Sequence, residues 1–197
     1  MKDDTVFRIL AVALFVAGAA IRLYHQWQAR RHGGPIQPRP EPIAFWLGIM
    51  LVSLVMLLSV TAFLLNPPWA AWGQVALPRG LRWAGAGIDM VAIALAVWVL
   101  HHLGPNLTRT AGVRANARLI TSGPYRWVRH PIYSVATAGW AGFGLMIASW
   151  PVLASAVLLI PLLALRIRSE EAALIERFGD EYREYMRTTG RLFPRLT

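Results

Sequence analysis

The chain has no cysteine among its 197 residues. This absence excludes disulfide bonds, thiolate nucleophiles and metal or iron–sulfur sites with cysteine ligands. Charged residues are also scarce, because they make up only 15% of the chain, whereas a soluble domain contains about 25%. Hydrophobic residues reach 56%. This composition is typical of a membrane protein whose core faces the lipid bilayer.

Acidic residues are fewer than basic ones: there are 10 Asp and Glu against 20 Lys and Arg, which gives a net charge of +10. A chain this basic could bind nucleic acid. Its basic residues, however, lie in loops beside apolar stretches, where such residues orient a membrane protein. We therefore expect no nucleic-acid partner.

Several apolar stretches are long enough to cross the membrane as helices, namely 6–24, 43–65, 83–100, 132–149 and 151–167. The clearest is 43–65, which has 23 residues and no charge. The first stretch is followed by His25, Gln26 and Trp27 instead of small residues, so we expect a retained helix and not a cleaved signal peptide. Residues 25–42 are polar and rich in proline, which predicts a loop.

The C-terminal tail, residues 168–197, is charged and amphipathic. Its pattern predicts two short helices separated at Gly179, lying on the membrane surface as a lid. The expected fold class is therefore all-α: a polytopic membrane protein with five transmembrane helices and a short amphipathic cytoplasmic lid. We expect residues 1–167, with the cytoplasmic loop 102–131, to form one domain and residues 168–197 to form the second.

The distribution of basic residues predicts the orientation. The 25–42 loop, the 102–131 loop and the tail from Arg166 carry 3, 5 and 7 basic residues. The opposite side has only Lys2, Arg8, Arg79 and Arg82. Because basic loops stay in the cytoplasm, we expect an integral protein of the cell inner membrane with an extracytoplasmic N-terminus and a cytoplasmic C-terminus.

Two features of the third stretch need an explanation. Asp89 is costly in hydrocarbon, so we expect it to pair with Arg82 or to reach the interface. Gly85, Ala86 and Gly87 look like the beginning of a dinucleotide-binding fingerprint. No strand precedes them and they lie in a membrane helix, so close packing between helices explains them better.

Two polar stretches are placed on the same side of the membrane. Residues 118–133 read RLITSGPYRWVRHPIY, and residues 166–179 read RIRSEEAALIERFG. About two membrane crossings separate them, and a hairpin of two transmembrane helices returns the chain to the side that it left. We therefore expect these stretches to form the active site.

The same residues carry a resemblance. The run Arg129 to Tyr133, the hydrophobic hairpin and then Glu170-Glu171 resemble the RHPxY-hydrophobic-EE signature of the isoprenylcysteine carboxyl methyltransferase family, whose relatives include phospholipid N-methyltransferases. The match extends through residues 121–125, Phe178-Gly179, Tyr182 and Tyr185, and covers roughly the last 80 residues. One departure is Val135, where relatives often carry glycine.

The resemblance implies S-adenosylmethionine as the cofactor and S-adenosylhomocysteine as its product, in a pocket completed by the helices of 168–197. In this cofactor, the ammonium suits a carboxylate of the protein, the carboxylate suits a hydrogen-bond donor, and the sulfonium and adenine suit aromatic rings. The implied cofactor-binding residues are Tyr125, His130, Pro131, Ile132, Tyr133 and Glu170. Arg166 is the implied catalytic and substrate-binding residue, and it shares a helical face with Glu170 at i and i+4. No metal is implied. Glu171 should point elsewhere, about 100° round the helix.

The expected reaction is carboxyl O-methylation of a lipophilic, isoprenylcysteine-like or otherwise prenylated acceptor that arrives from the membrane lipids. A carboxylate is already ionised at pH 7, so it attacks the methyl carbon without a general base. An alternative is N-methylation of a phospholipid or other lipophilic amine, which must first lose a proton. A small transporter or a cytochrome subunit, with His101 and His102 as haem ligands, is the alternative of another class.

Overall fold

The computed structural model describes residues 2–37 and 39–195, and most of them are helical. The long helices are α1 (Lys2–His32), α2 (Ile43–Leu65), α3 (Arg79–Leu103), α4 (Pro131–Met146) and α5 (Trp150–Phe178), followed by the shorter α6 (Asp180–Thr188). Short elements join them: β1 (Ile36–Gln37), β2 (Val113–Arg114) and the 3-10 helices η1 (Pro68–Gly73), η2 (Gly104–Asn106) and η3 (Gly123–Arg126).

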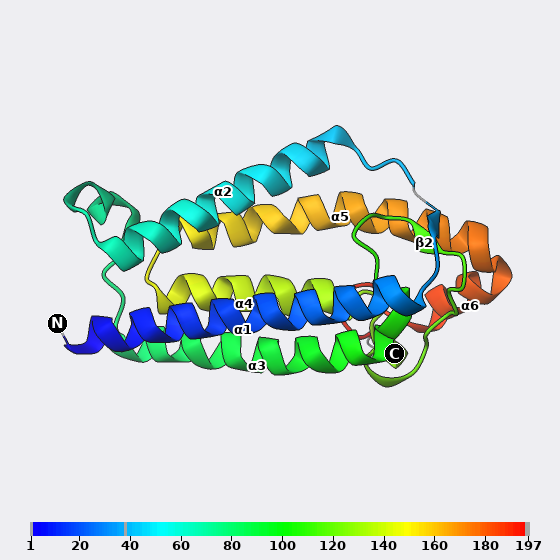
Figure 1. The fold of residues 1–197 in the computed structure, drawn as a ribbon, viewed down its shortest axis with the longest axis horizontal. Helices are drawn as coiled ribbons and strands as arrows, with labels where there is room; N and C mark the ends of the chain where they lie inside the picture. The colour runs from blue at the N-terminus through cyan, green and yellow to red at the C-terminus, as the bar shows by residue number, and fades with distance from the viewer. Residues whose placement is uncertain (1, 38, 196–197) are drawn as a thin grey trace.

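The long helices lie side by side along the molecule (Figure 1). The main contacts join α3 to α4, α2 to α5 and α4 to α5, while α1 packs mainly on α3. The N-terminus lies at one end of the bundle, and α6, β2 and the C-terminal segment lie at the other (Figure 1). This second end is where the two polar stretches of the sequence meet.

The protein is an integral membrane protein with four candidate membrane-spanning helices: α1 from Asp4, α2, α3 with η2, and α5. The stretch 43–65 was predicted with the bounds that α2 has. Helix α4 has 16 residues, a length of about 24 Å, which is shorter than the hydrocarbon layer of about 30 Å. Five crossings are therefore not established by length and composition, although α4 lies against both α3 and α5.

The prediction of a loop over residues 25–42 was wrong for its first part. Helix α1 continues to His32, because no proline or glycine occurs between Tyr24 and Gly33 to interrupt the backbone hydrogen bonds. Beyond the helix, β1 pairs antiparallel with β2. The Arg114 side chain donates hydrogen bonds to the carbonyls of Gly34 and Leu107. This short ribbon, a departure from an all-α chain, ties the α1–α2 connection to the 104–122 loop.

Helices α3 and α4 pack closely through small residues, as predicted for the glycines near Gly85. A Cβ atom added to Gly85 would lie 2.6 Å from the carbonyl oxygen of Gly142, and one added to Gly142 would lie 2.9 Å from the carbonyl oxygen of Gly85. Larger side chains would therefore separate the helices. Ala86 is buried in a cluster with Phe143 and Met146 of α4, whereas Gly87 has no neighbour within 4 Å, so the packing explanation holds for Gly85 and Ala86 but not for Gly87.

The expected pairing of Asp89 with Arg82 was wrong. Arg82 donates to Asp4 of α1 at 2.8 Å and to the carbonyl of Met146 at 3.0 Å. Seven residues separate Arg82 from Asp89, which places them about 10 Å apart along the helix axis. Asp89 is instead buried beside Gly139 of α4, where an added Cβ would lie 3.2 Å from its Oδ1.

Helix α5 carries the second polar stretch without a break. Pro161 lies inside it, which neighbouring helices allow in a membrane protein. Gly179 ends the helix with a φ of 57°, and α6 follows at once. The predicted boundary between residues 167 and 168 lies inside α5, and the division into two domains stays a prediction.

Candidate active site

The His130–Tyr133 motif lies at the start of α4, where Pro131 is favoured because its missing amide has no helical partner. The C-terminal segment of the chain fixes the first residue of this motif and the residue before it. The amide of Arg129 donates to the carbonyl of Gly190 at 2.8 Å, and that of His130 donates to the carbonyl of Arg191 at 3.1 Å. The chain end therefore holds the motif in place beside α5.

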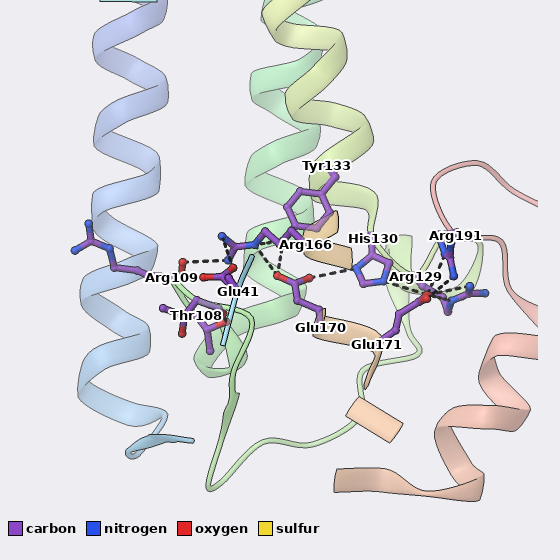
Figure 2. A network of polar contacts seen from close by, with 11 residues as sticks. Glu41, Thr108, Arg109, Arg129, His130, Tyr133, Arg166, Glu170, Glu171 and Arg191 are labelled. Carbon is purple, nitrogen blue, oxygen red and sulfur yellow. Dashed lines mark hydrogen bonds and ion pairs between the residues drawn. The ribbon is translucent and has the colours of Figure 1, made fainter. Parts of the chain in front are cut away.

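Arg166 and Glu170 of α5 meet Tyr133 of α4 in one cluster (Figure 2). The Nε of Arg166 donates to the Tyr133 hydroxyl at 2.8 Å and to Glu170 Oε1 at 2.9 Å. The Tyr133 hydroxyl in turn donates to Glu170 Oε1. Because these contacts join two helices through charged groups, they fix the carboxylate of Glu170 in one position.

His130 lies between the two carboxylates of α5 (Figure 2). Its Nδ1 is 3.5 Å from Glu170 Oε2, and its Nε2 is 3.4 Å from Glu171 Oε1. The ring also stacks on Tyr133, with centroids 5.8 Å apart. Glu171 points away from Glu170, as predicted, but it reaches the same histidine from the other side.

Glu171 binds two arginines in addition to His130. Arg129 Nε donates to its Oε1 at 3.0 Å, and Arg191 Nη2 donates to its Oε2 at 2.6 Å. Arg129 also donates to the carbonyls of Met186 and Thr189, at the end of α6. Glu171 therefore connects α5, the residues before α4 and the C-terminal segment.

A cavity of about 150 Å³ opens beside this network, between the 103–125 segment, α5 and α6. Five of the six residues predicted to bind the cofactor line it: Tyr125, His130, Ile132, Tyr133 and Glu170. The sixth, Pro131, lies on an apolar groove beside α3 instead. Arg166 does not line the cavity but binds two residues that do.

Two buried polar atoms beside the cavity make no hydrogen bond within the described residues. The Tyr182 hydroxyl is buried without any partner, and His130 Nε2 is buried with only the 3.4 Å ion-pair contact to Glu171 and no hydrogen bond; both residues line the cavity. A buried polar group without a partner is unfavourable unless a ligand or water satisfies it. With the carboxylate of Glu170 and the rings of Tyr125 and Tyr185, they offer groups that suit a sulfonium, an ammonium and an adenine.

Glu41 is a site residue that the sequence did not reveal. It lies just before α2, its side chain is only 2% exposed, and its Oε1 is 3.4 Å from Arg166 Nη1. Burial raises its pKa, although the charge of Arg166 opposes the shift. Arg166 Nη2 donates to the carbonyl of Arg109 at 3.0 Å, so all three nitrogens of the guanidinium have partners. One signal was available: Glu41 is the single acid in residues 25–42.

The pH dependence of stability should report on His130. Burial lowers the pKa of the ring, but the carboxylates of Glu170 and Glu171 outweigh it and raise the pKa above its usual value. A raised pKa contributes stability that is complete below about 6.5, the value in the unfolded chain, and that is lost as the pH rises through the folded pKa. Denaturant unfolding in detergent at rising pH should show this loss in the wild type and a smaller one in His130→Gln. Equal pH profiles would contradict it.

Comparison with known families agrees with this geometry. Residues 86–176 match the model of the isoprenylcysteine carboxyl methyltransferase (ICMT) family, and the match contains the His130–Tyr133 motif, the hairpin and the two glutamates. Residues 86–176 belong to this family. The matched segment runs from within α3 to near the end of α5 and excludes α1, α2 and α6.

Two curated proteins are similar in sequence. The cobalt-zinc-cadmium resistance protein CzcN of Cupriavidus metallidurans is 34% identical over 59% of this chain and 55% of its own length. The nickel-cobalt-cadmium resistance protein NccN of Alcaligenes xylosoxydans xylosoxydans is 27% identical over 75% of this chain and 63% of its own length. The chain therefore spans little more than half the length of these relatives.

A solved structure of this family shares the fold. The eukaryotic intramembrane Ras methyltransferase ICMT superposes with a TM-score of 0.57 over 94% of this chain and 67% of its own length, at 18% sequence identity. The similarity includes α1 and α2, which lie outside the family match. The whole bundle is thus an ICMT-like fold.

Proposed function

We propose that this ICMT-family membrane protein is an S-adenosylmethionine-dependent methyltransferase that acts on a lipophilic acceptor. The observation that carries the proposal is the cavity lined by Tyr125, Tyr133 and Glu170, together with the buried Tyr182 hydroxyl, which has no partner among the described residues. When bound, the cofactor supplies an electrophilic methyl group. The protein's own part is to orient both reactants and to exclude water.

The contacts of Arg166 suggest how this residue would bind the acceptor. Its contact with Glu41 is the loosest of its charged contacts, at 3.4 Å against 2.9 Å to Glu170. An acceptor carboxylate would replace Glu41 against Arg166 and keep the other hydrogen bonds of the cluster. The favoured reaction is therefore carboxyl O-methylation of an isoprenylcysteine-like acceptor, in which the carboxylate needs no general base.

Glu41 also favours a second class of acceptor. If its buried carboxylate stays in place, it would attract a lipophilic amine, as phospholipid N-methylation requires. Glu41→Gln separates these cases, because removing the charge should raise kcat/KM for a carboxylate acceptor and lower it for an amine. Product analysis by mass spectrometry with labelled cofactor and both acceptor types measures the change. Equal effects on both acceptors would show that Glu41 does not face the acceptor.

We also infer that the site end of the bundle faces the cytoplasm, where the cofactor is made. The excess of basic residues in the loops and tail at this end supports that orientation. In this arrangement α4, enclosed by α3 and α5, makes a fifth crossing, and its short length is accommodated by local thinning of the bilayer.

The cofactor proposal is tested with the purified protein in detergent. Calorimetry should show binding of S-adenosylhomocysteine, and Glu170→Ala should weaken it by about 1.5–3 kcal/mol, as for a charge-assisted hydrogen bond. Glu176→Ala is the matched control, since Glu176 lies on the same helix but is 79% exposed and pairs only with Arg39 among described residues. Binding that is absent in folded wild-type protein, or equally weak in both variants, would contradict the proposal.

A role in metal resistance is the second candidate, and the names of the two curated relatives favour it. Within residues 2–37 and 39–195 no group of three or more His, Asp and Glu is placed to hold a metal ion. The calorimetric experiment decides between the candidates: a folded protein that fails to bind the cofactor would leave metal resistance as the better one.

A further inference from the structure

A second polar cavity lies at the end of the bundle that carries the N-terminus, away from the candidate active site. Its volume is about 180 Å³. Its polar lining comes from α1, α3, the residue that caps the end of α2 and the connection between η1 and α3: Asp4, Arg8, Asn66, Gln74 and Arg82. None of these residues takes part in the network around Glu170, so the cavity is separate from the proposed function.

The two arginines of this cavity differ in their contacts. Arg82 is satisfied, because it donates to Asp4 and to the carbonyl of Met146, and its guanidinium lies 4.0 Å from the centroid of the Phe7 ring. Arg8 is not. Its Nε is buried and has no hydrogen-bond partner among the described residues. A buried charged donor of this kind calls for an acceptor from outside the chain.

The charges of the cavity do not balance. The guanidiniums of Arg8 and Arg82 lie 6.0 and 5.9 Å from the centroid of the same ring, that of Phe63. Asp4 is the one carboxylate among the described lining residues, and its side chain is 54% exposed and bound to Arg82. Two like charges held near one ring repel each other, and an anion between them would remove the repulsion.

The depth of the cavity in the membrane is marked by tryptophans. Trp69 and Trp72 of η1 are 67% and 65% exposed, and they come shortly before Gln74 in the chain. Trp150, which is 44% exposed, comes two residues after Ala148, a residue that lines the cavity. Its Nε1 donates to the carbonyl of Trp72. Exposed tryptophans gather at the level of the lipid headgroups. The cavity therefore lies at the depth where the bilayer presents its phosphates.

We propose that this cavity binds a phosphate group, which the membrane supplies as the headgroup of an anionic phospholipid. A phosphate offers several acceptor oxygens to the planar forks of Arg8 and Arg82, and guanidinium matches this geometry with paired hydrogen bonds. The amides of Asn66 and Gln74 add neutral donors. Bound there, the headgroup ties the ends of α1, α2 and α3 together.

The test uses the 197-residue chain, delipidated in detergent, with phosphatidylglycerol as the probe and native mass spectrometry as the readout. Arg8→Gln should weaken binding by about tenfold, since it removes the guanidinium whose buried Nε has no partner. Arg30→Gln is the matched control, because Arg30 is an exposed arginine on the same helix at the other end. Asp4→Asn should strengthen binding, because it removes the competing carboxylate.

The outcomes separate the source of the phosphate from the site itself. Inorganic phosphate that displaces the lipid completely would overturn the lipid as the ligand and leave a soluble phosphate in its place. Equal losses in Arg8→Gln and Arg30→Gln, or none in either, would overturn the site. If Arg8→Gln fails to fold, Asp4→Asn decides: unchanged or weaker binding in that variant would equally overturn the proposal.

Discussion

Replacing Arg166 by alanine should lower the rate of methyl transfer at least about a hundredfold and should also weaken binding of S-adenosylhomocysteine. Arg166 Nε holds both Tyr133 and Glu170, so its loss releases the carboxylate that lines the cavity. It also leaves Glu41 and Glu170 facing each other without a cation between them. Arg166→Lys should recover part of the rate, since lysine keeps the charge but not the fork.

The measurement combines transfer of a labelled methyl group to membrane lipids with calorimetric affinity for each variant. Arg168→Ala is the control: Arg168 is exposed on the same helix and lies about 200° round it from Arg166, so both quantities should stay at the wild-type level. If Arg166→Ala kept its cofactor affinity and lost turnover alone, Arg166 would act on the acceptor only. Full activity in this variant would show that Arg166 is only a charge at the membrane interface.

Hydropathy predicted the bounds of a helix best where the residues that flank the apolar stretch also end the helix. The stretch 43–65 has no charge and is flanked by Pro42 and Asn66, so the apolar run and α2 have the same bounds. For α1 the two differ, because the helix continues eight residues past Tyr24, to His32. Hydropathy marks where side chains meet water, whereas backbone hydrogen bonds continue until Gly33 and Pro35 interrupt them.

The candidate site could be predicted only in the parts that are local in sequence. His130 and Tyr133 are neighbours, Arg166 and Glu170 share a helical face, and one hairpin joins the two pairs. Glu41 was missed because its contact with Arg166 links residues 125 positions apart. The sequence pattern carries no information about that distance, which depends on how α2 packs against α5.

Replacing Glu171 by alanine should mainly lower the stability of the protein. Its side chain is 6% exposed and forms ion pairs with Arg129, which is 7% exposed, and with Arg191. Glu171→Ala would leave the charge of Arg129 buried without a carboxylate. We expect the free energy of unfolding to fall by about 3–5 kcal/mol, as when one partner of a buried ion pair is removed. Equilibrium unfolding in detergent measures it.

A matched surface pair makes this prediction specific. Glu184 and Arg187 of α6 form an ion pair with side chains 65% and 78% exposed, so Glu184→Ala should cost less than about 1 kcal/mol. Because Glu171 also holds the segment that positions His130, its loss should weaken S-adenosylhomocysteine binding, whereas Glu184→Ala should leave it unchanged. Similar stability losses in the two variants would show that water reaches Glu171 and that the C-terminal segment is held by its backbone hydrogen bonds alone.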